Sequence, residues 1–84
     1  ETTEHRLKRL KMRSWRRGIK EMDLILGPFA DHHLATLSGT ELDQYETLLG
    51  ENDQTLYTWF SGRETAPSNH TSIITVIQGA EKFN

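Results

Sequence analysis

The sequence contains no cysteine, so disulfides, thiolate metal sites and cysteine nucleophiles are excluded. Long apolar runs are missing too. The longest, Leu24–Leu26 and Ile73–Ile74, fall far short of the roughly 20 apolar residues that a membrane-spanning helix needs. With 84 residues the chain can build only one small hydrophobic core. We therefore expect a single domain over residues 1–84, with an ordered core at about 4–79 and no insertion into a membrane.

Patterns that accompany catalysis or cofactor binding are also missing. The sequence has no H-E-x-x-H, no G-x-S-x-G and no glycine-rich phosphate or dinucleotide motif. Its histidines include the adjacent pair His32 and His33, whose side chains diverge by about 100° on a helix and cannot hold one metal from one face. We expect His32 at the surface and His33 half-buried. The sequence predicts no enzymatic activity, no metal site and no cofactor held by the chain itself.

Charge is nearly balanced overall but unevenly distributed. Basic residues dominate the segment from Glu1 to Lys20, whereas acidic residues dominate from Glu21 onward. The basic segment could suggest nucleic acid, but its cations are not interleaved with aromatic residues for base stacking, and the acidic remainder would repel a polyanion. We expect a protein partner and no nucleic acid. A small nucleic-acid-binding regulator and a generic helical adaptor remain the alternatives.

Helical periodicity runs through almost the whole chain and predicts an all-α fold, a compact domain of five helices. The first two helices are expected at about 4–16 and 19–37, with a kink and no stop at Gly27-Pro28. A capping box at Ser38 and Glu41 opens a third helix, which Gly50 closes. The fourth begins near 52 or 53 and ends before Gly62, and the fifth runs from about 68 or 69, either of which could cap it, to 79.

The fifth helix is the least obvious of these predictions. Residues 72–77 are rich in β-branched side chains, which by propensity alone favour a strand. No other segment offers a pairing partner, however, and a lone strand would leave its backbone groups without hydrogen bonds. Ile73, Ile74 and Ile77 also share one face of a helix. We therefore predict a helix.

The densest cluster of unusual features is residues 15–23, where Arg17, Gly18 and Glu21 form the pattern R-G-x-x-E. In this motif and in its helical frame the chain resembles a family of small assembly factors. These factors promote covalent FAD attachment to the flavoprotein subunit of succinate dehydrogenase. The resemblance covers nearly the whole chain and is looser beyond Gly62.

The resemblance implies a five-helix chaperone that binds the immature flavoprotein subunit and selects one conformation of it. The fumarate reductase flavoprotein is implied as a related client. The flavin is linked within the flavoprotein's own active site, so FAD is carried by the partner. The resemblance further implies that Arg17 and Glu21 contact the partner around the bare backbone of Gly18.

The residues themselves leave a second interpretation of the motif open. Gly18 could simply end the first helix in a left-handed conformation, with Glu21 capping the second helix and Arg17 matching the helix dipole. The resemblance favours the first interpretation, in which the junction displays a guanidinium and a carboxylate outward.

Further candidates for partner contact flank the motif or lie on the fourth helix. They are Arg13, Arg16 and Asp23 beside the motif, and Asp53, Tyr57 and Trp59 on the fourth helix. Tyr57 is expected on an exposed face, whereas a core position is favoured for Trp59 and expected for Trp15. We expect a monomer. The short ends of the chain favour a bacterial cytoplasm, or a mitochondrial matrix if the sequence has been trimmed.

Overall fold

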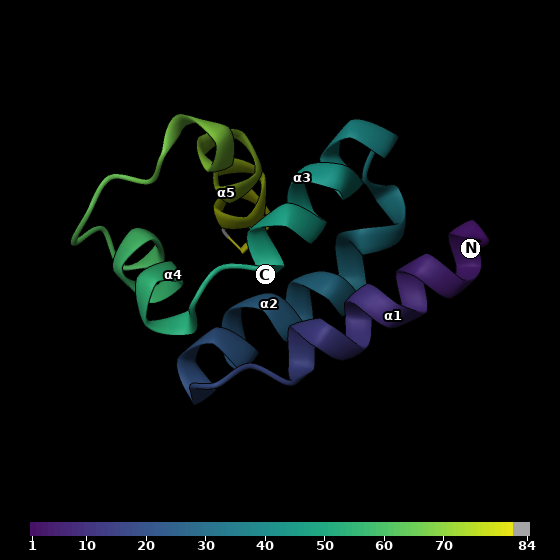
Figure 1. Cartoon of the computed structure of the whole chain (residues 1–84), viewed down its shortest axis with the longest axis horizontal. Helices are drawn as coiled ribbons and strands as arrows, with labels where there is room; N and C mark the ends of the chain where they lie inside the picture. The colour runs from purple at the N-terminus through teal and green to yellow at the C-terminus, as the bar shows by residue number, and fades with distance from the viewer. Residues whose placement is uncertain (82–84) are drawn as a thin grey trace.

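Five α-helices follow one another along the chain in the computed structural model, which describes residues 1–81 (Figure 1). They are α1 (Thr3–Trp15), α2 (Lys20–His33), α3 (Gly39–Leu49), α4 (Asp53–Phe60) and α5 (Ser68–Glu81), with a short 3-10 helix, η1 (Leu34–Thr36), after α2. The all-α, five-helix prediction is confirmed. Across residues 1–81 no helix combines the length and the apolar character needed to cross a membrane. The predicted domain boundary at 84 lies outside the described residues.

Local sequence signals set several helix ends. The Ser38 hydroxyl accepts from the backbone N–H of Glu41, and the Glu41 carboxylate accepts from the backbone N–H of Ser38, so the predicted capping box is confirmed. The Asn52 side chain accepts from the N–H groups of Gln54 and Thr55 at the start of α4. These bonds satisfy N–H groups that a helix start leaves unpaired.

The fifth segment is helical despite its β-branched residues. Ile73, Ile74 and Ile77 are all buried, so burial of one face outweighs the weak strand preference of these side chains. The hydroxyls of Thr71 and Thr75 donate back to the carbonyls of Pro67 and Thr71. Ser68, proposed above as a possible cap, is instead the first residue within the helix.

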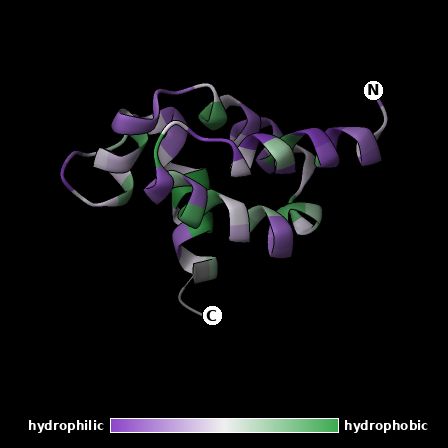
Figure 2. Cartoon of the chain, turned by 90° about the horizontal axis from the view of Figure 1, so that it is seen from below, coloured by the Kyte–Doolittle hydropathy of each residue, from purple (hydrophilic) through white to green (hydrophobic). Residues whose placement is uncertain are grey.

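The core forms where the five helices face one another. Figure 2 shows the mainly hydrophilic colouring of α1 beside the greener segments at the centre of the molecule. Tyr45 of α3 is fully buried at this centre and stacks against Phe29 of α2, with ring centroids 5.6 Å apart. Leu10 is the fully buried apolar residue of α1. The small core thus holds α1 and α2 against the other three helices.

Helix α2 continues through Pro28, as predicted, and ends at His33, earlier than the expected residue 37. The chain then tightens into η1 before reaching Ser38. Pro28 has no N–H, so it leaves the carbonyl one turn earlier without its usual partner. The kink itself remains a prediction. His32 is exposed and His33 is half-buried, as expected.

Two expectations about the end of α1 are wrong. Trp15 is 42% exposed and does not enter the core, because its ring lies over the buried backbone of Gly27 in α2. Gly18 does not adopt a left-handed conformation, since Gly62 is the glycine with positive φ in residues 1–81. Helix α1 ends at Trp15, with Arg16 as its C-cap residue. A left-handed backbone therefore does not explain the glycine at position 18.

Candidate functional site

The connection between α1 and α2 lies against the start of α4, and this junction contains the R-G-x-x-E motif. Figure 1 shows α4 beside the first turn of α2. Helix α4 begins at Asp53, directly after the Asn52 cap. Because Asn52 already caps the free N–H groups of this helix, the Asp53 carboxylate is available to residues from elsewhere.

Asp53 binds two consecutive residues of the motif. The Arg17 Nε–H donates to Asp53 Oδ1 at 2.6 Å, and the backbone N–H of Gly18 donates to Asp53 Oδ2. The Arg17 side chain is 8% exposed and that of Asp53 is 17% exposed, so water screens this ion pair only weakly. We call the contacts of Arg17 and Gly18 with Asp53 the junction clamp.

Two further contacts complete the surroundings of Arg17. Its Nη2 donates to the backbone carbonyl of Glu51 at 3.2 Å, in the loop that leads into α4. Its backbone N–H donates to Asp23 Oδ1 at 2.7 Å, which ties the end of the connection to the first turn of α2. Arg17 thus joins α2 and α4 through both its side chain and its backbone.

The missing side chain of Gly18 leaves room for Asp53. A Cβ atom at this position would lie 2.9 Å from Asp53 Oδ2, closer than carbon and oxygen atoms normally approach without a bond. Glycine is favoured here by close approach and not by backbone conformation, since a side chain would displace the Asp53 carboxylate. The carboxylate that occupies the space belongs to the chain itself.

Glu51 connects the junction clamp to α5. Its carboxylate lies 2.7 Å from Nε2 of His70, which is fully buried and stacks against Trp59 with ring centroids 5.4 Å apart. Nδ1 of His70 is buried without a hydrogen-bond partner in the described structure. Because a carboxylate oxygen accepts, Nε2–H of His70 donates to Glu51.

The structure places the predicted site residues in two groups. Arg17 is turned inward, so the expectation that its guanidinium projects outward is wrong. Asp23 also makes an internal bond and is half-buried. Glu21 and Arg16 are exposed, and Arg13 is half-buried. Glu21 is the second residue of α2 and makes no capping bond, so the alternative interpretation of Glu21 as a cap is wrong.

Tyr57 lies apart from these residues. It is half-buried on α4 and packs against the hydrophobic core, so its expected exposure holds only in part. Trp59, on the same helix, is buried as expected. The structure therefore brings Arg17, Gly18, Glu21 and Asp23 together and leaves Tyr57 outside their cluster. Whether any of these residues contacts a partner stays a prediction.

Beside the junction, side chains of α1 line a shallow hollow. Its walls are Arg9, Met12, Arg13, Arg16 and Arg17. Arg9 is held by Glu1 at 2.8 Å and by Glu46 at 2.9 Å, and Arg17 is held by Asp53. Arg13 and Arg16 form no ion pair within residues 1–81. The hollow is thus cationic, with the thioether side chain of Met12 exposed beside two uncompensated guanidinium groups.

Two residues have other roles than the sequence predicted: Asp53 binds Arg17 and Gly18 within the chain, and Trp15 is exposed. An acidic residue next to an Asn cap was a usable signal for Asp53, because the helix start needs only one of the two side chains. Trp15 gave no local signal of its exposure. In the described part of the chain, no group of three or more His, Asp or Glu side chains is arranged to hold a metal ion.

Comparison with known proteins gives a consistent result along most of the chain. A family model described as the flavinator of succinate dehydrogenase matches residues 8–81. Succinate dehydrogenase assembly factor 2, mitochondrial, of Meyerozyma guilliermondii is 48% identical over 59 residues, which are 70% of this chain and 44% of that protein. The protein of the same name from Candida glabrata is 42% identical over 59 residues, which are 70% of this chain and 39% of that protein.

A third relative of that name, from Aspergillus terreus, is 41% identical over 63 residues, which are 75% of this chain and 21% of that protein. The chain therefore spans less than half the length of these relatives. The match to the family model includes the second part of α1, the other four helices and the complete R-G-x-x-E motif. The chain belongs to the family of succinate dehydrogenase flavinators.

Proposed function

We propose that this chain binds the flavoprotein subunit of succinate dehydrogenase and promotes the covalent attachment of FAD to it. Membership of the flavinator family supports the proposal, as do the names of the relatives, which describe succinate dehydrogenase assembly factors. The structural observation that carries it is that Arg17 and Gly18 of the motif make internal hydrogen bonds, whereas the Glu21 side chain makes none within residues 1–81. Arg17, Gly18 and Asp53 fix the shape of the junction, and Glu21 is left exposed at its surface.

The proposed mechanism is conformational selection by a chaperone, not catalysis by this chain. A protein that binds one arrangement of its client more tightly than others raises the population of that arrangement. The junction clamp suits this task because it presents a rigid surface, which lowers the entropic cost of binding. In this account FAD stays with the flavoprotein, and this chain acts as a monomer.

Two finer points belong to the same proposal. The fumarate reductase flavoprotein is a second client, since a surface that recognises one such subunit would fit a related one. The relatives carry the word mitochondrial in their names, which favours the mitochondrial matrix over a bacterial cytoplasm for this chain. The nucleic-acid alternative is weakened, because Arg6 and Arg9 of the basic helix are engaged by Asp43, Glu46 and Glu1.

Replacing Glu21 tests the proposal at the exposed part of the motif. Glu21→Gln removes a charge from the surface while keeping the side chain's size, so we expect weaker binding to the purified flavoprotein. We also expect less covalent flavin, measured as fluorescence of the denatured flavoprotein in a gel. Glu4→Gln is the matched control, since Glu4 is also an exposed acid in the first turn of a helix.

The decisive comparison uses cells that lack their own assembly factor. Supplying this chain should restore covalent flavin, and the Glu4→Gln chain should do so equally well. Covalent flavin that is the same with and without the chain would reject the proposed function.

A further inference from the structure

The large apolar side chains exposed within residues 1–81 all lie on the first two helices. They are Met12, Trp15 and Leu24, which are 47%, 42% and 59% exposed. Two of them come from α1 and one from α2. Large aromatic and aliphatic side chains that stay exposed together mark surfaces that bind other molecules.

Trp15 is held in one orientation by two residues of α2. Its ring lies against the backbone of Gly27, where a Cβ atom would come within 2.5 Å of the indole. Its Nε1–H donates to Asp31 Oδ1 at 3.2 Å. The indole is thus fixed in position without being buried. A tryptophan that is already ordered in the free protein loses little side-chain freedom on binding, so it is suited to anchor a partner.

Helical spacing joins these residues to the exposed part of the motif. Residues three or four positions apart are neighbours on a helix surface. Met12 therefore lies one turn before Trp15, and Leu24 lies one turn before Gly27, which supports the indole. Glu21 lies one turn before Leu24. We call Met12, Trp15 and Leu24 the apolar strip, and it runs from α1 across to α2.

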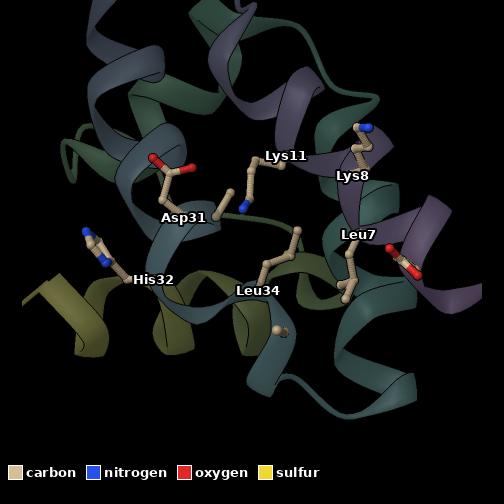
Figure 3. Close-up of a pocket in the computed structure, with 9 residues that line it drawn as sticks. Leu7, Lys8, Lys11, Asp31, His32 and Leu34 are labelled. Atoms are coloured by element: carbon tan, nitrogen blue, oxygen red, sulfur yellow. The ribbon is translucent and has the colours of Figure 1, made fainter.

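Cations border the apolar strip on both sides. Lys11, Arg16 and Lys20 are exposed and form no ion pair within residues 1–81. Figure 3 shows Lys8 and Lys11 of α1 on one side of a hollow, with Asp31 and His32 of α2 on the other. The Asp31 carboxylate is engaged by the indole N–H. Glu21 is the exposed acid beside Leu24, so these three unpaired cations against this one carboxylate leave the border of the strip with a surplus of positive charge.

We propose that the apolar strip is a docking site for an acidic, amphipathic segment of the flavoprotein subunit, with Trp15 as its anchor. An apolar side chain of that segment packs on the indole and on Leu24, and its carboxylates pair with Arg16 and Lys20. The inference rests on the proposed function and names the chemistry of the surface that the client presents. It moves the centre of the interface from Arg17, which is internal, to Trp15.

Charge complementarity selects this occupant over a second copy of the chain. In a symmetric pair of copies the cations that border one strip would face the same cations of the other, which is unfavourable. An acidic segment neutralises them, and attraction at long range also speeds association at low salt. Binding should therefore weaken as salt is raised.

The test measures binding of the full chain to the purified flavoprotein subunit by calorimetry. Trp15→Ala removes the anchor and should weaken binding by at least tenfold. Gly27→Ala leaves Trp15 in the sequence but adds a methyl group where the indole lies, so it should weaken binding as well. Gly39→Ala is the matched control, because a Cβ atom there meets nothing within 4 Å. It should bind as the wild type does.

The variants also separate docking from folding. Trp15 is partly exposed, so we expect Trp15→Ala to keep its helical content and a cooperative thermal transition. Asp31→Ala frees the indole without adding bulk and should weaken binding less than Gly27→Ala does. For wild type, raising NaCl should reduce affinity, and the double change Arg16→Ala and Lys20→Ala should reduce that salt dependence.

Three results would overturn the inference. The first is binding by folded Trp15→Ala and Gly27→Ala chains that equals wild type. The second is affinity that does not change with salt. The third is a wild-type dimer in sedimentation that Trp15→Ala dissociates, since the strip would then bind a second copy. If Trp15→Ala binds normally but Glu21→Gln does not, docking at the apolar strip is rejected while the proposed function stands. No binding by wild type rejects both.

Discussion

At the scale of single residues, a buried pair of hydroxyl groups joins α1 to α3. Ser14 is fully buried in α1 and its hydroxyl donates to the carbonyl of Leu10 at 2.8 Å. That leaves the Ser14 oxygen as the acceptor for the Tyr45 O–H, at 2.6 Å. Burial raises the pKa of Tyr45 to about 12, because the charged phenolate would be poorly solvated there. This pair ties α1 to the centre of the core.

Because Tyr45 donates and Ser14 accepts in this hydrogen bond, replacing the two residues should lower stability by different amounts. Tyr45→Phe removes the donor while Ser14 keeps its bond to Leu10, so the free energy of unfolding should fall by about 1 kcal/mol. Ser14→Ala leaves the buried Tyr45 O–H without an acceptor and should cost more, about 1–3 kcal/mol. The double variant should be no less stable than Ser14→Ala alone. Urea unfolding measures all three, and strictly additive losses would contradict the assignment.

Residue-scale predictions from sequence succeeded where the partner was close in the chain. Ser38 and Glu41 are three positions apart, so their capping box could be identified from the sequence. Arg17 and Asp53 are 36 positions apart, and no residue near Arg17 in the sequence indicates that its partner lies at the start of α4. Trp15 was misplaced for the same reason, since its exposure depends on the bare backbone of Gly27.

At the scale of helices, ion pairs hold α1 against α3. Arg6 of α1 pairs with Asp43 and Glu46, and Arg9 also pairs with Glu46. The hydrogen bond from Arg9 lowers the pKa of Glu46 below its usual value of 4.5. A lowered pKa means that the folded state favours the charged carboxylate. The resulting stability is present above the usual pKa and is lost as pH falls through the lowered value.

Replacing Glu46 should therefore have an effect that depends on pH. At pH 7 Glu46→Gln should lower the free energy of unfolding, by less than about 1 kcal/mol because water reaches these side chains. At a pH well below this lowered pKa the wild-type carboxylate is protonated, so the difference between the two proteins should shrink. Thermal unfolding at both pH values measures this. A difference that grows toward low pH would contradict the role of Glu46.

The helix pattern was predictable from sequence for reasons that act at this scale. Apolar residues at helical spacing and the caps at Ser38 and Asn52 located α3 and α4. In α5 the strand preference of single residues is outweighed, because the helix buries Ile73 and Ile77 in the core. The end of α2 at His33 could not be predicted, since the apolar spacing continues to Leu37.

At the scale of the whole molecule, the chain divides into a support and a surface. The support is the core together with the junction clamp, through which α4 fixes the connection between α1 and α2. The surface is the exposed part of α1 and α2, which includes Glu21 and the apolar strip. A rigid support is what allows a small chaperone to select one conformation of a larger client. This account assigns Arg17 to the support, although the motif had suggested a contact with the partner.

The most direct test of this assignment is the free energy of unfolding in urea for Arg17→Ala and Glu21→Gln. Arg17→Ala breaks a weakly solvated ion pair and should lose about 2–4 kcal/mol. Glu21→Gln changes an exposed side chain and should stay within about 0.5 kcal/mol of wild type. An Arg17→Ala chain as stable as wild type would contradict the account, because Arg17 would then be free to serve the partner instead of the fold.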